Sequence, residues 1–120
     1  MWIAVAGAAG AVSRYQVEGV VSRLTRGAFP WGTLVVNLSG CFLLGLVFTL
    51  LTERFLPHPD LRVAVTVGFL GAYTTLSTFA FESLRLGQDG AMGRATLNVV
   101  LSVAGGILAA WLGTVAARAF

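Results

Sequence analysis

The sequence contains no lysine, and all eight of its basic residues are arginine. Charged residues make up only 11% of the 120-residue chain, whereas a soluble globular domain carries roughly 25%. A chain of this size has too little interior to hide a hydrophobic content of 57% from water. The shortage of charge therefore predicts an integral membrane protein whose solvent is lipid.

Other absences exclude further classes of protein. Cys41 is the only cysteine, so no internal disulfide can form, and no cluster of cysteine and histidine offers a zinc site. A net charge of +3 without a basic run argues against nucleic acid as a partner. His58, the one histidine, lies between Pro57 and Pro59 in a predicted loop, away from every serine expected in the membrane. A hydrolase, and an enzyme in general, is therefore not expected.

Stretches without formal charge locate the membrane spans. Three of them cover residues 27–52, 63–81 and 95–117, and each is close to or above the roughly 20 residues that a helix needs to cross a bilayer. The first segment contains Arg14 and Glu18, which lie on one face of a helix and can partly neutralise each other. We therefore expect one all-α membrane domain over residues 1–120, with four transmembrane helices at about 2–22, 32–52, 62–84 and 95–117.

The distribution of arginine bears on orientation. Four spans with short connections place both termini on one side of the membrane. Three arginines are expected on that side and four on the other, namely Arg54, Arg62 and Arg118 against Arg23, Arg26, Arg85 and Arg94. Such near-equal counts give the positive-inside rule no basis for choosing an orientation. Two interpretations stay open: one fixed orientation, or insertion both ways with assembly of an antiparallel dual-topology dimer.

The centre of the third span is unexpectedly polar. The run GFLGAYTTLSTF at 68–79 contains two glycines and four hydroxyl residues. Glycine and threonine are poor helix formers, and hydroxyl side chains can satisfy backbone groups at a break. We expect this helix to be broken near mid-membrane, with the carbonyls of Gly71 and Thr74 facing a small cation and a half-helix N-terminus favouring an anion. A hydroxyl-rich packing kink is the competing interpretation.

Phe79 follows the expected break. Its ring edge carries partial positive charge and can replace water around a small anion. Polar or small residues also recur at four-residue spacing on two other spans, at Thr33, Asn37 and Cys41 in the second and at Asn98, Ser102 and Gly106 in the fourth. Interhelical hydrogen bonding and an ion pathway explain these stripes equally well.

Small residues in the fourth span predict close packing. Gly105, Ala109 and Gly113 recur at four-residue spacing, which forms the kind of ridge along which helices associate in lipid. Packing alone accounts for these positions, so no site is expected there.

Four runs of sequence resemble those of a known family. They are GFLGAYTTLSTFAFES at 68–83, which is the most specific, GAVSRY around Arg14, GTLVVNLSG at 32–40 and LNVVLSVAGG at 97–106. Together they are similar to the Fluc, or CrcB, family of fluoride channels, over all four spans and nearly the whole chain. The resemblance implies a fluoride-selective channel in the inner membrane that exports fluoride passively from the cytoplasm. It also implies an antiparallel dual-topology dimer with two pores.

The resemblance also assigns roles to single residues. The backbone carbonyls of Gly71 and Thr74 match those that hold a structural sodium ion, which is not transported. Asn37 and Arg14 match residues beside the pore, and Asn98 and Ser102 match a polar track on the fourth helix. The anion pathway is expected to include Phe79, Asn37, Asn98, Ser102, Arg14, Thr33, Thr75, Ser77 and Leu76.

The chain departs from the family pattern at Leu76. Where the family pattern TTFSTF has two phenylalanines that contact the anion, Phe79 matches the second and Leu76 replaces the first. Leucine has no positive ring edge and gives an anion only apolar surface. Either the protein conducts more slowly, or it pairs with a paralogous subunit that supplies the missing ring. Asn98 and Gly106 also depart, since some members have tyrosine and serine there.

A small dual-topology antiporter coupled to protons is the alternative function. It would need a carboxylate well inside the bundle, and the candidates are Glu18 and Glu82. Arg85 follows Glu82 by three residues, which favours an ion pair near the membrane surface instead. A bundle subunit with a purely structural role also stays open.

Overall fold

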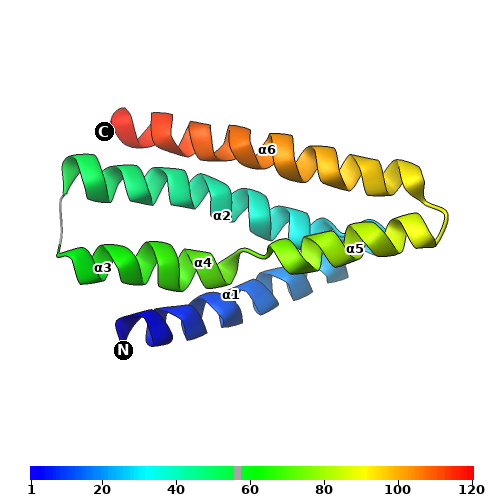
Figure 1. The fold of residues 1–120 in the computed structure, drawn as a ribbon, viewed down its shortest axis with the longest axis horizontal. Helices are drawn as coiled ribbons and strands as arrows, with labels where there is room; N and C mark the ends of the chain where they lie inside the picture. Colours follow the sequence, from blue (N-terminus) through cyan, green and yellow to red (C-terminus); the bar gives the residue numbers. More distant parts are fainter. Residues whose placement is uncertain (56–57) are drawn as a thin grey trace.

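The structure is a computed structural model that describes residues 1–55 and 58–120. Over these ranges the chain forms four helical rods and no strand, in a body of 49 × 30 × 22 Å. The rods run roughly along the long axis, and both termini lie at the same end (Figure 1). The predicted all-α architecture is confirmed for the described residues, and the arginines divide between the two ends as expected.

The four rods follow one another along the chain. The first is α1 (Trp2–Thr25), and the second is α2 (Trp31–Thr49) continued by the π-helical turn η1 (Leu50–Arg54). The third combines α3 (Pro59–Val63), the π-helical segment η2 (Ala64–Leu70), α4 (Gly71–Tyr73) and α5 (Leu76–Gln88). The last rod is α6 (Met92–Arg118). Most rods extend a few residues beyond the expected spans, because helical hydrogen bonding continues past the apolar stretch.

Three of the rods are long and apolar enough to cross a membrane, namely Trp31–Arg54, Pro59–Gln88 and Met92–Arg118. Helix α1 has the length but is not among these three, because Arg14, Gln16 and Glu18 lower its hydropathy. Nη1 of Arg14 and Oε1 of Glu18 lie 3.8 Å apart. The predicted pairing of these two charges is therefore confirmed.

Helices α2 and α6 form the most extensive contact in the bundle and run parallel, both toward the end where the termini lie (Figure 1). A Cβ atom added to Gly45 of α2 would overlap the carbonyl oxygen of Ala110. A Cβ atom added to Gly113 of α6 would likewise overlap the carbonyl oxygen of Phe42. Each helix thus presents a glycine to the backbone of the other, and the close packing predicted along the fourth span is confirmed at Gly113.

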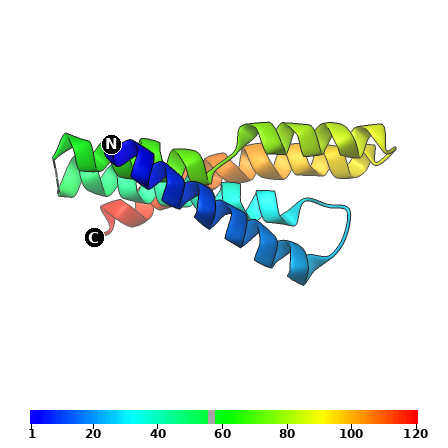
Figure 2. The same ribbon diagram turned by 90° about the horizontal axis from the view of Figure 1, so that it is seen from below.

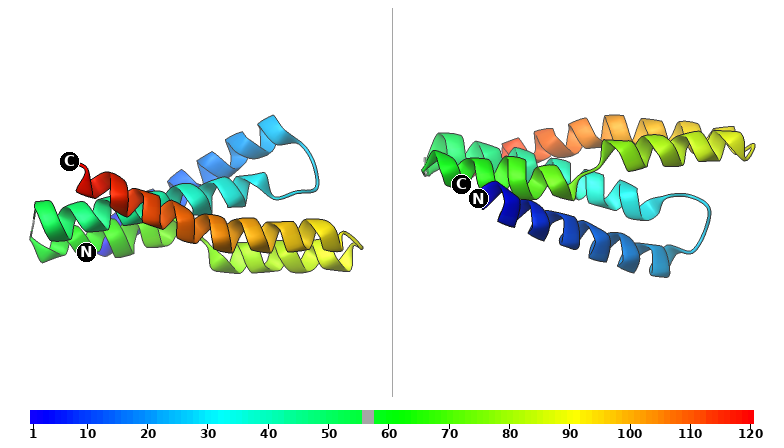
Figure 3. Two further views of the ribbon diagram at one scale, coloured as in Figure 1. Left: turned by 90° about the horizontal axis from the view of Figure 1, so that it is seen from above. Right: turned by 60° about the horizontal axis from the view of Figure 1, so that its bottom comes forward.

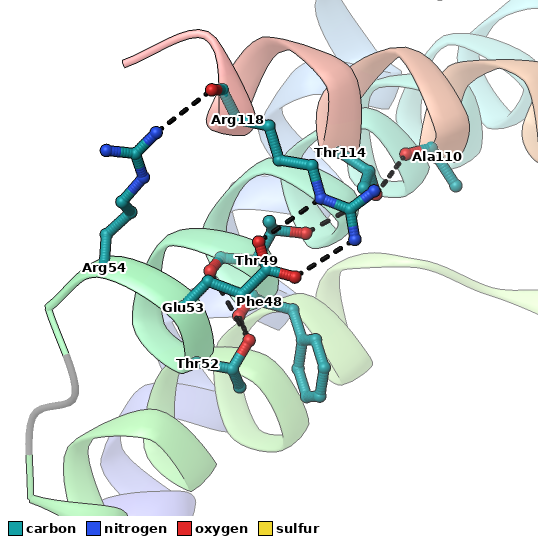
Figure 4. A network of polar contacts seen from close by, with 8 residues as sticks. All are labelled: Phe48, Thr49, Thr52, Glu53, Arg54, Ala110, Thr114 and Arg118. Atoms are coloured by element: carbon teal, nitrogen blue, oxygen red, sulfur yellow. Dashed lines mark hydrogen bonds and ion pairs between the residues drawn. The ribbon is translucent and has the colours of Figure 1, made fainter.

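Polar contacts fasten the same two rods near the chain termini (Figure 4). Nη2 and Nε of Arg118 donate to the two carboxylate oxygens of Glu53 at 3.0 and 3.3 Å. Nη2 of Arg54 donates to the carbonyl oxygen of Arg118 at 3.0 Å. This network satisfies a backbone carbonyl at the C-terminus of α6, where no helical donor follows.

Helix α1 packs against η2 of the third rod. A Cβ atom on Gly10 would overlap the carbonyl oxygen of Phe69, and one on Gly68 would lie 3.0 Å from the Cβ atom of Ala6. The outer surface of the bundle remains apolar, with side chains such as Ile107 and Trp111 of α6 exposed by 69% and 59%. Lipid or a partner must cover such a surface.

The connection before α3 lies partly outside the described residues, as does Pro57 of the predicted loop. His58 precedes α3, and its Nδ1 accepts a hydrogen bond from the backbone N–H of Asp60 at 3.1 Å. The histidine therefore serves as the N-cap of a helix.

Candidate functional site

The third rod is broken at its centre. Helix α4 ends at Tyr73 and α5 begins at Leu76, with Thr74 (φ −85°, ψ 158°) and Thr75 (φ −148°, ψ 117°) in extended conformation between them. Figure 2 shows the chain step sideways here, so that α5 continues along α6. The predicted break is confirmed, and the alternative of a kinked but continuous helix is wrong.

Asn37 of α2 holds the extended segment on one side. Its Nδ2 donates to the carbonyl oxygen of Thr75 at 2.9 Å, and its Oδ1 accepts from the backbone N–H of Thr75 at 2.8 Å. One side-chain amide thus pairs with both backbone groups of Thr75, whose N–H has no helical acceptor. An apolar side chain at position 37 would remove both of these hydrogen bonds, and a polar group left without a partner is costly away from water.

The hydroxyl of Thr75 caps the second half-helix. Oγ1 of Thr75 accepts from the backbone N–H of Thr78 at 3.3 Å and donates to Oγ1 of Thr78 at 3.0 Å. Threonine is a favoured N-cap residue because its oxygen replaces the missing helical acceptor. The cap fixes the start of α5, whose N-terminal end carries partial positive charge.

These contacts change the backbone hydrogen bonding around Gly71 and Thr74. In an α-helix, each carbonyl accepts from the N–H four residues later. The N–H of Thr75 would serve Gly71 but donates to Asn37, and the N–H of Thr78 would serve Thr74 but donates to the Thr75 hydroxyl. Both carbonyls therefore lose their helical partner. They are the two that the resemblance assigns to sodium, and carbonyl oxygen is a ligand suited to hard cations, so the residues fit such an ion.

A central cavity of about 300 Å³ lies beside the break, between the second, third and fourth rods. Both Gly71 and Thr74 line it. Of the residues expected in the anion pathway it brings together Asn37, Thr75, Leu76, Phe79 and Ser102. Cys41 and Thr66 also line it, although Thr66 satisfies its hydroxyl on the carbonyl oxygen of Arg62 at 2.7 Å. Thr66 was missed because a single threonine in an apolar stretch gives no signal.

A second, open cavity of about 480 Å³, the vestibule, lies at the end away from the termini. Figure 2 shows α1 and the start of α2 diverging there from α5 and α6, and Figure 3 shows the same opening from two further directions. Of the residues expected in the anion pathway, Thr33 lines the vestibule. Glu18, Thr78 and Glu82 line it as well. The two glutamates were considered as ion-pair partners of arginine and as coupling groups for an antiporter, but not as residues of the anion pathway.

The ion pair expected between Glu82 and Arg85 is wrong. Among the described residues the pair does not form, and the guanidinium carbon of Arg85 lies 6.0 Å from the ring centroid of Phe81. Arg85 and Glu82 both line the vestibule, but the arginine turns to the aromatic ring one helical turn before it. A cation above a ring face is attracted by the ring quadrupole.

The remaining pathway residues lie apart from the two cavities. Nε of Arg14 donates to the carbonyl oxygen of Ala72 in α4 at 3.3 Å. Asn98 is 1% exposed, and its Nδ2 donates to Oγ of Ser83 at 2.8 Å between α5 and α6. Ser77 is exposed on the first turn of α5.

Asn98 belongs to a chain of hydrogen bonds along α5 and α6. Ser83 donates to the carbonyl oxygen of Phe79 at 2.9 Å, and Ser102 donates to Oδ1 of Asn98 at 3.5 Å. Within one copy of the protein, these hydrogen bonds join α5 to α6. Ser83 was not predicted as a site residue, although its spacing of four from Phe79 on the same helix face was the available signal.

Apolar rods of membrane-crossing length, with one rod broken beside a cavity, define a multi-pass membrane protein. The family model described as CrcB-like protein, Camphor Resistance (CrcB), matches residues 1–114. The chain belongs to this family, and the resemblance noted in the sequence is confirmed.

Several curated relatives are similar over nearly their full length. A protein of Acidobacterium capsulatum is 47% identical over 115 residues, which is 96% of this chain and 92% of the relative. A protein of Geobacter sulfurreducens is 47% identical over 97% of this chain and 94% of its own length. A third, from Magnetococcus marinus, is 49% identical over 98% of this chain and 95% of its own. Each of the three is named a fluoride-specific ion channel, FluC.

Proposed function

We propose that this protein is a fluoride-selective ion channel of the cell (inner) membrane that exports fluoride passively from the cytoplasm and lowers its concentration there. The names of its relatives support this function. The observation in this chain that carries it is the break at Thr74 and Thr75. There the N-terminal end of α5 and the ring of Phe79 lie at one largely apolar cavity, into which Asn37, Thr75 and Ser102 bring polar groups.

The chemistry of that cavity suits a small anion. The N-terminus of α5 offers partial positive charge, and the edge of the Phe79 ring offers more. Ser102 brings a hydroxyl from α6, and Asn37 an amide from α2. Fluoride is strongly hydrated, so hydroxyl, amide and ring-edge donors would have to replace its water.

The channel is proposed to hold a structural sodium ion, which is not transported, at the carbonyls of Gly71 and Thr74. The loss of helical partners at both carbonyls supports this site. A bound cation would supply positive charge at the break and neutralise the partial negative charge of the carbonyls. The chain itself supplies the oxygen ligands and fixes their direction through Asn37 and Thr75.

We further propose that two copies assemble as an antiparallel dual-topology dimer with two pores, with all four rods crossing the membrane. The near-equal numbers of arginine at the two ends of the bundle support insertion in both orientations. Leu76 is 77% exposed beside the break, so a partner can reach this position. A second copy is proposed as that partner, and a paralogous subunit with phenylalanine at this place is the alternative.

Liposome flux distinguishes this function from the antiporter. Purified protein in vesicles loaded with fluoride should release it when the membrane potential is shunted, and release should not respond to an imposed proton gradient. A matched vesicle loaded with chloride should release little. Fluoride release that stops without a proton gradient would instead favour an antiporter coupled through Glu18 or Glu82.

A further inference from the structure

We infer that Asn37 is a positioning residue for the cation at the break, and that it acts by keeping the carbonyl of Gly71 out of the helical hydrogen-bond ladder. The inference rests on the proposed function, because the cation is the structural sodium ion proposed there. It gives Asn37 a role that differs from direct contact with the anion.

Two acceptors compete for one donor at the break. The N–H of Thr75 has two possible acceptors: the carbonyl of Gly71, if the helix of α4 continued, and Oδ1 of Asn37. In the structure it donates to Asn37 at 2.8 Å, and Thr75 adopts an extended conformation. The carbonyl of Gly71 therefore stays available in the central cavity, which both residues line.

The second hydrogen bond of the Asn37 amide fixes the orientation of Thr75. Nδ2 of Asn37 donates to the carbonyl oxygen of Thr75 at 2.9 Å, so the peptide units on both sides of Thr75 are held by one side chain. A side chain that only accepts would still capture the N–H of Thr75. A side chain with no polar atom would release it, and the turn could then close onto Gly71.

The hydroxyl of Thr75 acts in the same way on the carbonyl of Thr74. It takes the N–H of Thr78, which would otherwise serve the carbonyl of Thr74. Two side-chain oxygens, on Asn37 and Thr75, thus each remove one donor from one carbonyl. Because Asn37 comes from a different rod, its position couples the cation site to the packing of α2.

The experiment compares Asn37→Ala with Asn37→Asp. Asp keeps an oxygen that can accept from Thr75, whereas Ala keeps none. Thr49→Val is the matched control, because Thr49 is also a buried hydrogen-bonding residue of α2, and it bonds Thr114 near the opposite end of the bundle. Purified full-length protein is titrated with sodium against potassium, and thermal unfolding is followed in the absence of fluoride.

Sodium should raise the unfolding temperature of the wild-type protein. Asn37→Ala should need about tenfold more sodium for the half-maximal effect, since the Gly71 ligand is lost to the helix. Asn37→Asp and Thr49→Val should keep the wild-type midpoint to within about threefold, even if their starting stability is lower. Fluoride efflux, measured in parallel, should fall in both Asn37 variants, because Asp adds a negative charge beside the anion.

The outcomes separate the inference from the function on which it rests. If the wild-type protein does not respond to sodium, the proposed sodium site fails. If the wild type responds and Asn37→Ala keeps the same midpoint while its efflux falls, Asn37 acts on the anion directly and the inference is overturned. If Asn37→Asp loses the sodium response as fully as Asn37→Ala, capture of the Thr75 N–H is not the cause, and the inference is overturned as well.

Discussion

Arg14 of α1 and Ala72 of α4 are joined by a hydrogen bond of 3.3 Å from the guanidinium Nε to the backbone carbonyl oxygen. The bond lies two residues before the break and crosses between two rods that are far apart in sequence. Asn37 of α2 forms two hydrogen bonds with the backbone of Thr75. The break is therefore held on both sides, by side chains that come from α1 and α2.

Replacement of Arg14 by alanine should remove the hydrogen bond to the carbonyl of Ala72. It leaves the carbonyl of Ala72 and the carboxylate of Glu18 without their partner, and we expect fluoride efflux to fall by about tenfold. Arg14→Lys keeps the charge near Glu18 but not the planar donor, so its efflux should lie between those of the wild type and Arg14→Ala. Arg23→Ala, an exposed change on the same helix, is the control. Equal efflux from all four proteins would show that the bond has no role.

The glycine contact between α2 and α6 should be sensitive to a single methyl group. Gly113→Ala places a Cβ against the carbonyl of Phe42 and should lower the free energy of unfolding by about 1–3 kcal/mol. Gly93→Ala on the same helix meets open space, and should be neutral or stabilising by up to about 1 kcal/mol. Unfolding in mixed detergent micelles measures both. Similar values for the two variants would contradict the close packing of α2 and α6.

Leu76 and Phe79, two residues of the expected anion pathway, can be tested by substitution. Leu76→Phe adds a ring edge at an exposed place beside the central cavity, so fluoride efflux should be preserved or raised. Phe79→Ala removes the ring that is present and should lower efflux by about tenfold or more, if the ring contributes about 1.4 kcal/mol to binding the ion in transit. An unchanged rate in Phe79→Ala would remove Phe79 from the pathway.

Asn98 and Ser83 can be tested as a structural pair. Asn98→Ala removes the donor to the Ser83 hydroxyl and the acceptor of the Ser102 hydroxyl, and should cost about 1–3 kcal/mol of unfolding free energy. Ser83→Ala should cost less once Asn98 has been replaced, because the bond between them is already lost. Additive effects in the double variant would show that the two side chains are not coupled.

Much of this fold follows from the positions of charge and glycine. The charge-free stretches located three rods, and glycine, threonine and serine between 68 and 79 located the break. Helix α1 was harder, since Arg14 and Glu18 interrupt its apolar pattern. Their pairing on one face was nevertheless predictable from their spacing, because residues four apart on a helix are neighbours.

The partners of the polar residues could not be predicted. Four-residue spacing placed Asn37 on a polar face, but spacing carries no information on which backbone group of another rod lies opposite. The same limit applied to Arg85, where Glu82 and Phe81 were both within reach and the ring was preferred. Asn98 looked equivalent to Asn37 in sequence, yet one lines a cavity and the other is sealed between two helices.

This chain alone is proposed to form a passive fluoride channel with a cation at its broken helix. Its most direct test uses the purified chain in liposomes loaded with fluoride, with a fluoride electrode outside and sodium either present or fully replaced during purification. We expect rapid, complete fluoride release that depends on sodium during purification, with little release of chloride. No fluoride release from correctly folded protein in sodium would contradict it.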